Sequence, residues 1–305
     1  MRTNTTEVGQ ADDFLPLRGR TLRDARYVSR VVTLEDDFQY VLRKAMKGCG
    51  LAASEVAERA GVPQADVQQL VMGRFSAATA RVVAPVLGLD PEALASHPSY
   101  PGGPPLPPEV VRLVLPFGDL GVNVWLVRAP GATLLFDAGS DPEALDGELR
   151  RLAVHRLDAA FITHDHPDHV AGLAVVRRLT GRIFSPDHET LRGTEPIEPH
   201  AAHEFGGVRV VALASEGHTP GALSYRVDGL SAPVCVVGDA LFAGSMGGCP
   251  DRESYLLARM RIGDQILTLP GATVLLPGHG PVTSVAIEQR HNPFFAGAAG
   301  VETNG

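Results

Sequence analysis

The chain has 305 residues, 44% of them hydrophobic and 20% charged, an ordinary composition for a globular protein with room for one large domain or two smaller ones. The formal net charge of −8 argues against broad, non-specific nucleic-acid binding by the whole molecule. The first 14 residues are polar and lack the apolar core of a signal peptide, and no charge-free run reaches membrane-spanning length, so we expect a cytoplasmic protein. The three cysteines are too scattered for a disulfide framework or a zinc knuckle.

The first third of the chain has the pattern of several short helices. Residues 1–36 are polar and weakly periodic, and the sequence leaves open whether they form a tail or a strap. From residue 37 onward, apolar side chains such as Phe38, Val41 and Leu42 recur at helical spacing. Ser54 is expected to cap the next helix. The later helices are expected at Glu55–Ala60, Gln64–Met72 and Ala78–Leu87, the last of these broken or bent near Pro85, with a final short helix that begins near Pro91.

Ala57 and Gly61 favour a close crossing of two of these helices, because a small residue and a glycine turn let the backbones approach. Over roughly sixty residues the segment resembles the helix-turn-helix of the phage-repressor-like (XRE-type) family. The resemblance implies that the helix after the turn contacts DNA through Gln64 and Gln68, with Arg74 nearby. However, residues 41–96 carry six basic and five acidic side chains, and phosphate contacts dominate DNA affinity. We therefore favour a helical bundle, used for dimerisation or for packing on the rest of the chain, over operator binding.

A proline-rich stretch at residues 97–109 separates this segment from the remainder of the chain. Proline at this density excludes helix and sheet interiors and favours a stiff extended linker. We expect four parts: a tail or strap at 1–36, a helix-turn-helix-like helical domain at 37–96, the linker at 97–109 and a larger domain at 110–305. In the larger domain strands are expected at Val110–Leu115, Val122–Val127, Thr133–Phe136, Ala159–Ile162, Val208–Leu213, Leu223–Val227, Val234–Val237 and Thr273–Leu276, and helices at Ala144–Ala153, Val170–Leu179 and Ser254–Leu269. This order indicates an α+β fold with two sheets flanked by helices.

Three histidines and an aspartate fall between His164 and His169, directly after an apolar strand. Imidazole and carboxylate groups suit zinc, iron or manganese. Alternate residues of an extended segment share a face, so His164, His166 and Asp168 are expected to converge, with His169 serving a neighbouring position. Three further ligand candidates each leave an apolar strand and enter a glycine-containing turn: His218, Asp239 and His279.

Taken in order, these residues resemble the HxHxDH–His–Asp–His pattern of the metallo-β-lactamase superfamily, over roughly Val110 to Phe295. The resemblance implies an αβ/βα sandwich, here with a smaller N-terminal all-α domain. It implies two divalent metal ions, zinc being the first expectation and iron or manganese compatible with the same ligands. The implied ligands are His164, His166 and His218 for one metal, Asp168, His169 and His279 for the other, and Asp239 as a bridge, with Asp168 and Asp239 as the catalytic carboxylates.

The same resemblance implies a reaction. A metal-bound hydroxide would attack an acyl carbonyl, because two metals lower the pKa of water toward ~7. Asp137 matches a family position that supports the metal ligands from behind, its alternative being a simple turn aspartate. Tyr225 and Ser245 are expected to contact substrate.

Within the superfamily, the segments Gly238–Ser245, Leu276–Pro281 and Asn292–Phe295 resemble the glyoxalase II group. That implies hydrolysis of a thioester or a related acyl substrate, whose thiolate leaves without a separate general acid. Glyoxalase II uses a C-terminal helical domain to grip glutathione, and the sequence stops about ten residues after Phe295, so we expect that domain to be missing. Its frequent Gly-Arg-Thr-Asp segment is also replaced, by residues 246–251. Both departures argue against a glutathione thioester as substrate.

Two alternatives stay open. One is a persulfide dioxygenase with a single iron held by His164, His218 and Asp239. The other is a regulator whose helical segment binds DNA while the larger domain senses or processes a metabolite. The expected partner is a small-molecule substrate. No membrane partner is expected, nucleic acid is not favoured, and a homodimer through the helical domain is left open.

Overall fold

The computed structural model describes residues 33–118, 121–186 and 191–297, all of which belong to one compact unit. Of the expected tail or strap at 1–36, only residues 33–36 are described. Within the described ranges, no helix combines the length and the apolar character that crossing a membrane would require.

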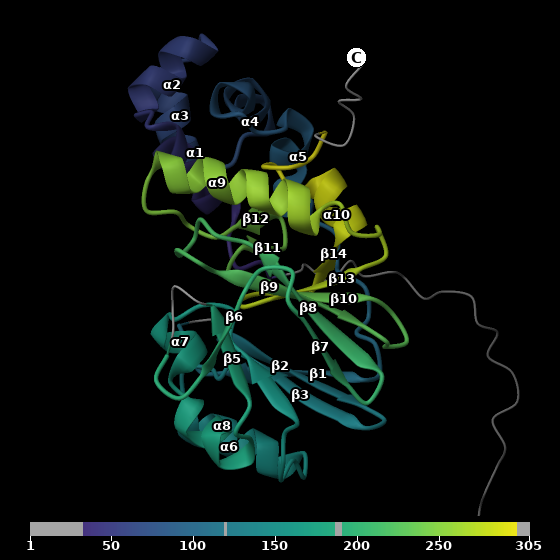
Figure 1. Ribbon diagram of the computed structural model, residues 1–305. Helices are drawn as coiled ribbons and strands as arrows, with labels where there is room; N and C mark the ends of the chain where they lie inside the picture. Colours follow the sequence, from purple (N-terminus) through teal and green to yellow (C-terminus); the bar gives the residue numbers. More distant parts are fainter. Residues whose placement is uncertain (1–32, 119–120, 187–190, 298–305) are drawn as a thin grey trace, which may run out of the picture. The chain divides into compact units, whose positions relative to one another are not determined.

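Two six-stranded sheets form the larger part of the molecule (Figure 1). The first sheet runs in the order β1 (Val110–Leu115), β2 (Val122–Ala129), β3 (Ala132–Phe136), β4 (Ala159–Phe161), β5 (Ile183–Pro186) and β6 (Glu195–Ile197). Its first three strands are antiparallel and its last four, β3 to β6, are parallel. The second sheet runs in the order β14 (Thr283–Ser284), β13 (Val274–Pro277), β10 (Val234–Gly238), β9 (Leu223–Asp228), β8 (Val208–Ala214) and β7 (Ala202–Phe205).

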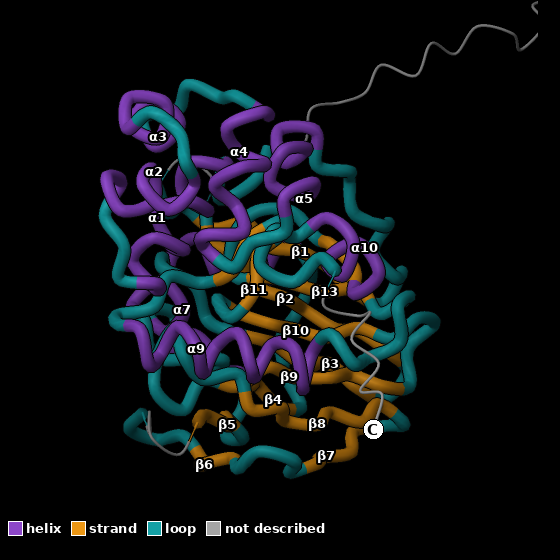
Figure 2. Tube along the Cα trace, turned by 90° about the horizontal axis from the view of Figure 1, so that it is seen from above, coloured by secondary structure: helices purple, strands orange, loops and turns teal. Residues whose placement is uncertain are grey.

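Helices cover the outer side of each sheet (Figure 1, Figure 2). On the first sheet lie α6 (Pro142–Arg151) and α8 (Leu173–Leu179), and on the second lie α9 (Arg252–Arg261), continued by one π-helical turn at Ile262–Ile266, and α10 (Val285–His291). A short helix, α7 (Pro167–Val170), and a hairpin of β11 (Leu241–Phe242) and β12 (Ser245–Met246) complete this part. The inner faces of the sheets enclose an aromatic core that includes Trp125, Phe136 and Phe161. The expected αβ/βα sandwich is confirmed.

The helical segment consists of α1 (Phe38–Cys49), α2 (Ala53–Ala60), α3 (Gln64–Val71), α4 (Ala77–Val83), a 3₁₀ turn at Ala84–Leu87, α5 (Pro91–Ser96) and a 3₁₀ turn at His97–Ser99. One continuous apolar cluster joins its interior, for example Leu42 and Leu70, to Tyr255 and Ile262 at α9. Gly48 of α1 lies directly against the Tyr255 ring, where an added Cβ would come within 2.3 Å of the ring carbons. The segment is thus packed onto the second sheet's helices, while the domain boundaries stay a prediction.

Several local expectations need correction. Helix α2 begins at Ala53, two residues before the expected start at Glu55, so Ser54 is not its cap. The N–H of Ala52 donates to the Glu55 carboxylate at 2.8 Å, and this hydrogen bond closes the first turn. The helix expected at Val170–Leu179 is divided into α7 and α8. The elements that we did not expect are β5, β6, β7, β11, β12, β14 and α10.

Candidate metal centre

The seven predicted ligand side chains follow the ends of four strands that belong to both sheets. His164, His166, Asp168 and His169 follow β4 of the first sheet, while His218, Asp239 and His279 follow β8, β10 and β13 of the second. The carboxyl ends of these strands bring the segments together at one edge of the sandwich. Three overlapping groups of their donor atoms lie within 4.8 Å of one another: His164 with His166 and His218, His164 with His169 and Asp239, and Asp168 with His169 and His279.

The first trio is His164, His166 and His218. Nε2 of His218 lies 3.1 Å from Nδ1 of His166, while Nδ1 of His218 donates to the carbonyl oxygen of Gly248 at 2.7 Å. That hydrogen bond places the proton of His218 on Nδ1 and leaves the lone pair of Nε2 facing the cluster. The ring of His164 is fixed in the same way, with its Nδ1 3.0 Å from Oγ1 of Thr163.

The second trio is Asp168, His169 and His279. Nε2 of His279 lies 3.1 Å from Oδ2 of Asp168, and Nδ1 of His279 donates to the carbonyl oxygen of Gly121 at 3.1 Å. Nδ1 of His169 donates to Oδ2 of Asp137 at 2.8 Å. Each ring is therefore held from behind through Nδ1, so that Nε2 points inward, which is the arrangement that orients histidine ligands of metals.

Asp239 lies between the two trios. Its Oδ2 is 3.6 Å from Nε2 of both His218 and His279, and its Oδ1 is 3.3 Å from Nε2 of His169. The backbone of Gly278 closes over the carboxylate, since a Cβ at this position would lie 2.2 Å from Oδ1 of Asp239. The position is that of a carboxylate shared between two neighbouring sites.

Burial and crowding shape the charges of the cluster. Burial would raise the pKa of the Asp239 carboxyl, but the surrounding imidazoles, His169 first, hold it well below its usual range. Burial lowers the pKa of His164, and the neighbouring His169 lowers it further. For His169 burial also lowers the pKa, yet the carboxylates of Asp239 and Asp137 raise it well above the ordinary value. Metal ligation requires deprotonated donors, so a cation in this cluster would displace a proton from His169.

Among the ligand candidates, three buried donor or acceptor atoms have no hydrogen-bond partner within the described ranges: Nε2 of His164, Nε2 of His169 and Oδ1 of Asp239. Buried polar atoms are almost always paired in folded proteins. All three belong to one of the donor groups described above, and nitrogen and oxygen donors of this kind suit zinc, iron and manganese. The residues present therefore fit a metal centre, although the identity of the metal is open.

The segment that carries the histidine motif is not extended throughout. The chain turns into α7 at Pro167, so Asp168 and His169 project from a helical turn, and the N–H of His169 donates to the carbonyl oxygen of His166 at 2.9 Å. This corrects the expectation that Asp168 shares an extended face with His164. The helical turn is what directs Asp168 and His169 to the second trio.

Asp137 lies directly behind the histidine segment. Its backbone is left-handed, with φ of 62°, and its carboxylate accepts from the N–H of Thr163 at 2.8 Å as well as from His169. It therefore fixes the start of the histidine segment and one of the rings in that segment. Its role as a support of metal ligands stays a prediction.

Two other expectations differ from what the structure contains. Tyr225 and Ser245 are both fully buried, and the Tyr225 hydroxyl donates to the carbonyl oxygen of Ile162 at 2.7 Å between the sheets. Burial corrects the expectation that they contact substrate, because neither side chain reaches a surface in this conformation. Gln64 and Gln68 of α3 and the nearby Arg74 are exposed, and DNA contact by them stays a prediction.

A cavity of about 470 Å³ opens on the cluster at His279. Its wall includes Phe117, Tyr40 of α1 and two residues that directly precede α1, Glu35 and Asp36. None of the four was predicted from the sequence, because they match no ligand motif and no spacing rule. Their arrangement means that residues 35–40 form part of the approach to the candidate site.

Comparison with known proteins agrees with this geometry. The family pattern described as the metallo-beta-lactamase superfamily matches residues 117–279, which is more than half of the chain. The chain therefore belongs to the metallo-β-lactamase superfamily.

Its similarity to particular proteins is lower and partial. The probable metallo-hydrolase YqgX of Bacillus subtilis is 29% identical over 209 residues, which cover 60% of this chain and 96% of that protein. A hydroxyacylglutathione hydrolase of Pseudomonas putida is 34% identical over 110 residues, which cover 34% of this chain and 42% of that protein. The chain thus matches less than half the length of that relative.

Two solved structures share the sandwich. The BLEG-1 B3 metallo-β-lactamase superimposes with a TM-score of 0.52 and 28% identity, and the match covers 61% of this chain and 100% of that one. ETHE1 from Myxococcus xanthus superimposes with a TM-score of 0.51 and 26% identity, covering 61% of this chain and 85% of that one.

Proposed function

We propose that the protein is a metal-dependent hydrolase that cleaves a thioester or a related acyl substrate. One observation carries the proposal: three buried, unpartnered atoms of His164, His169 and Asp239 face a common centre, with Asp239 midway between two complete trios. Membership of the superfamily and the similarity to YqgX support a metallo-hydrolase. The similarity to hydroxyacylglutathione hydrolase supports the thioester as substrate.

The proposed ligands are His164, His166 and His218 for one metal, Asp168, His169 and His279 for a second, and Asp239 for both. Bound divalent cations there would make water nucleophilic at neutral pH and would polarise an acyl carbonyl. Among the protein's own groups, Asp137 and the carbonyl oxygens of Gly121 and Gly248 hold three of the rings through Nδ1. These contacts keep the rings oriented before substrate arrives, which lowers the cost of assembling the site.

A thioester suits such a site better than an amide does. A thiol has a pKa of about 8.5 and leaves readily as the thiolate, whereas an amine must be protonated as it leaves. The two proposed catalytic carboxylates, Asp168 and Asp239, lie against His279 and His169 and are occupied in holding the centre. The chemistry therefore favours a leaving group that needs no proton.

The test combines metal analysis with a panel of acyl thioesters and uses the full-length protein. We expect up to two equivalents of a divalent metal and thioester turnover, both lost in Asp239→Ala and both retained in Asp264→Ala, an exposed aspartate away from the cluster. Intact turnover in Asp239→Ala would contradict the proposal. A single equivalent of iron together with oxygen uptake and no hydrolysis would instead support the persulfide dioxygenase alternative.

A further inference from the structure

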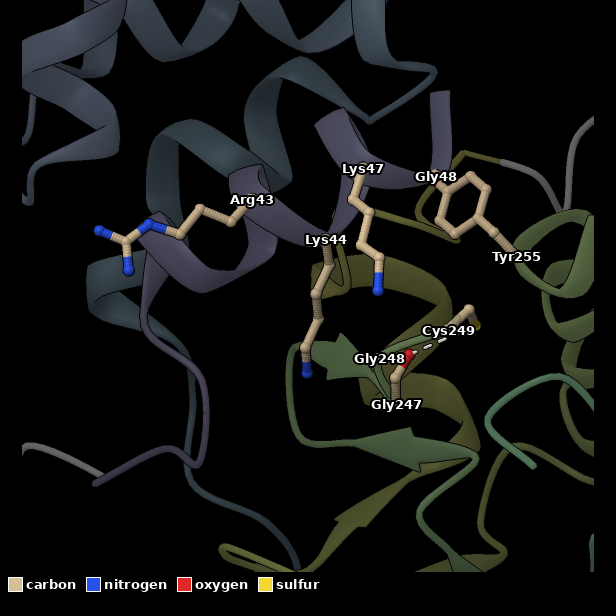
Figure 3. Close-up of a pocket in the computed structure, with 8 residues that line it drawn as sticks. All are labelled: Arg43, Lys44, Lys47, Gly48, Gly247, Gly248, Cys249 and Tyr255. Atoms are coloured by element: carbon tan, nitrogen blue, oxygen red, sulfur yellow. Dashed lines mark hydrogen bonds between the residues drawn. The ribbon is translucent and has the colours of Figure 1, made fainter. Parts of the chain in front are cut away.

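A second cavity lies on the other side of the Gly247–Gly248 segment, against α1 (Figure 3). Its volume is about 220 Å³, and it is lined by Arg43, Lys44 and Lys47 of α1 together with Cys249 and Tyr255. The matched family region spans residues 117–279, so the α1 side of this cavity lies outside that region. Helix α1 thus supplies a wall to this cavity from outside the part of the chain that matches the family.

The cavity gathers an unusual set of charges. The chain has 27 Lys and Arg residues, of which only Lys44 and Lys47 are lysines, and both lysines line this cavity. Lys44 is fully engaged, because it pairs with Asp36, donates to the carbonyl oxygen of Met246 at 2.8 Å and lies over the Phe242 ring. It serves to attach α1 to the β11–β12 hairpin.

Lys47 is different. Within the described ranges its ammonium makes no hydrogen bond and no ion pair, and it points from α1 towards Gly248 and Cys249 (Figure 3). Burial raises the pKa of the Cys249 thiol to about 11, so that neighbour is uncharged at neutral pH. The nearby acidic residue, Asp251, is exposed and its carboxylate accepts the N–H of Ser254 at 2.8 Å as the cap of α9. The Lys47 side chain is exposed, and although its charge attracts Asp251, its ammonium has no hydrogen-bonded partner within the described ranges.

The cavity adjoins the metal cluster through one short segment. The carbonyl oxygen of Gly248 accepts from His218, while a Cβ at Gly248 would lie 3.9 Å from Cε of Lys44. A Cβ at Gly247 would lie 1.9 Å from the carbonyl oxygen of Asp239. The two glycines thus form a thin wall with the cluster on one side and the α1 cavity on the other.

Asp36 links this cavity to the larger one that opens on His279. The carboxylate of Asp36 lines the larger cavity, and its ion-pair partner Lys44 lines the smaller one. Residues 35–47 therefore border both spaces beside the cluster. The larger cavity opens on the cluster at His279, and the Asp36–Lys44 pair stands between it and the smaller cavity.

We propose that Lys47 binds a carboxylate or phosphate on the thiol portion of the substrate, which makes the substrate class an acyl thioester of an anionic thiol. The inference rests on the proposed hydrolase function. An ammonium with free donors binds such oxygens through charge-assisted hydrogen bonds. The helical segment then acts as a substrate-recognition element of the enzyme.

The kinetic test uses the metal-loaded full-length protein and three acetyl thioesters: that of N-acetylcysteamine, which is neutral, that of glutathione, which carries carboxylates, and that of coenzyme A, which carries phosphates. We expect Lys47→Ala to raise KM for the preferred anionic thioester about tenfold, with kcat changed less than twofold. Lys47→Arg is expected to retain most of the affinity and Lys47→Glu to lose more than Lys47→Ala. The matched control is Arg59→Ala, an exposed cation on α2.

The outcomes separate the two proposals. An equal rise in KM for the neutral and anionic thioesters, or no rise at all, overturns the role of Lys47. If the wild type hydrolyses none of the three thioesters, the hydrolase proposal fails. The anion site is then tested separately, by measuring the rate at which an amine-reactive acetyl ester labels Lys47. Coenzyme A or glutathione is expected to slow labelling of Lys47 several-fold while Lys44 is unaffected. Absence of protection by either thiol overturns the site.

Discussion

Nδ1 of His169 donates to the carboxylate of Asp137 at 2.8 Å, and Nε2 of the same ring lies 3.3 Å from Oδ1 of Asp239. One imidazole thus joins a supporting carboxylate to the carboxylate at the centre of the cluster. The arrangement fixes the tautomer of His169, because the proton on Nδ1 is used by Asp137. Nε2 then becomes available to a metal once the cation has displaced the proton that the raised pKa of His169 keeps there.

Asp137→Asn should therefore weaken metal binding at the second trio. The left-handed backbone of Asp137, with φ of 62°, accepts asparagine without added strain, so the change removes the charge and little else. We expect metal affinity to fall by about 10-fold to 100-fold, measured by competition with a chromogenic chelator. Unchanged affinity, with Asp264→Asn as the control, would show that Asp137 is only a turn residue.

Gly278→Ala should empty the centre without unfolding the protein. The added Cβ would lie 2.2 Å from Oδ1 of Asp239 and 2.6 Å from Cε1 of His169. Displacing these groups by about 1 Å is enough to cost on the order of 100-fold in turnover. We expect loss of bound metal and of activity, read by metal analysis and kinetics, with the circular dichroism spectrum retained.

The control is Gly147→Ala on α6, where an added Cβ meets nothing within 4 Å. Alanine there removes a helix-interior glycine, so stability should rise slightly. If Gly278→Ala kept its full metal content, the close packing of Gly278 on Asp239 would be wrong.

The sequence located the cluster and most of the strands for one physical reason. Each ligand segment follows an apolar strand and enters a turn. The ends of strands at one edge of the sandwich lie close together, and this does not depend on the conformation of the loops. Short or polar elements such as β6, β14 and α10 have no such signal. The break between α7 and α8 depends on Gly172, where a Cβ would lie 2.2 Å from the carbonyl oxygen of Ala138, a contact that no local pattern reveals.

The substrate contacts were the least predictable part. Tyr225 lies on β9, and alternation along a strand does not tell which face is enclosed when both sides of a sheet are covered. Conversely, Glu35 and Asp36 approach the site from an irregular segment far away in sequence. Their position follows from the packing of α1 onto α9, which depends on one glycine facing one tyrosine ring.

Glu288 should make stability depend on pH. Its Oε1 meets the hydroxyls of Tyr100 and Thr283, and these hydroxyls also lie 2.7 Å from each other. Both hydroxyls donate to Oε1, while the side-chain amide of Asn292 and the N–H of Gly244 donate to Oε2. Burial raises the pKa of Glu288 to about 7, although the hydrogen bonds it accepts from Thr283 and Tyr100 oppose this rise.

The sign follows from the raised pKa. The folded state holds the Glu288 proton more tightly than the unfolded state, so this contribution is complete below the unfolded pKa of about 4.3 and is lost as pH rises through about 7. Between pH 5 and pH 8 the loss is on the order of 2 kcal/mol. Glu288→Gln keeps a neutral group and should remove this part of the pH dependence, measured by urea unfolding at both pH values. An identical pH dependence in wild type and Glu288→Gln, beside the exposed control Glu253→Gln, would contradict a protonated Glu288.

Gly48→Ala should loosen α1 from α9 and so test whether the helical segment shapes the site. The added Cβ would lie 2.3 Å from the ring of Tyr255, and Tyr255 is buried, so the ring cannot move aside freely. Overpacking of this kind costs about 1–3 kcal/mol, measured by urea unfolding. Because Lys47 and the wall of the α1 cavity would shift with the helix, KM for the anionic thioester should rise while bound metal stays constant.

The matched control is Gly263→Ala, where an added Cβ meets nothing within 4 Å. A double variant, Gly48→Ala with Tyr255→Leu, should regain part of the lost stability, because the smaller side chain leaves room for the methyl group. If the rise in KM were accompanied by loss of metal, the substitution would be acting on the metal cluster and not on substrate binding by α1. A stable variant with unchanged KM would separate α1 from substrate binding altogether.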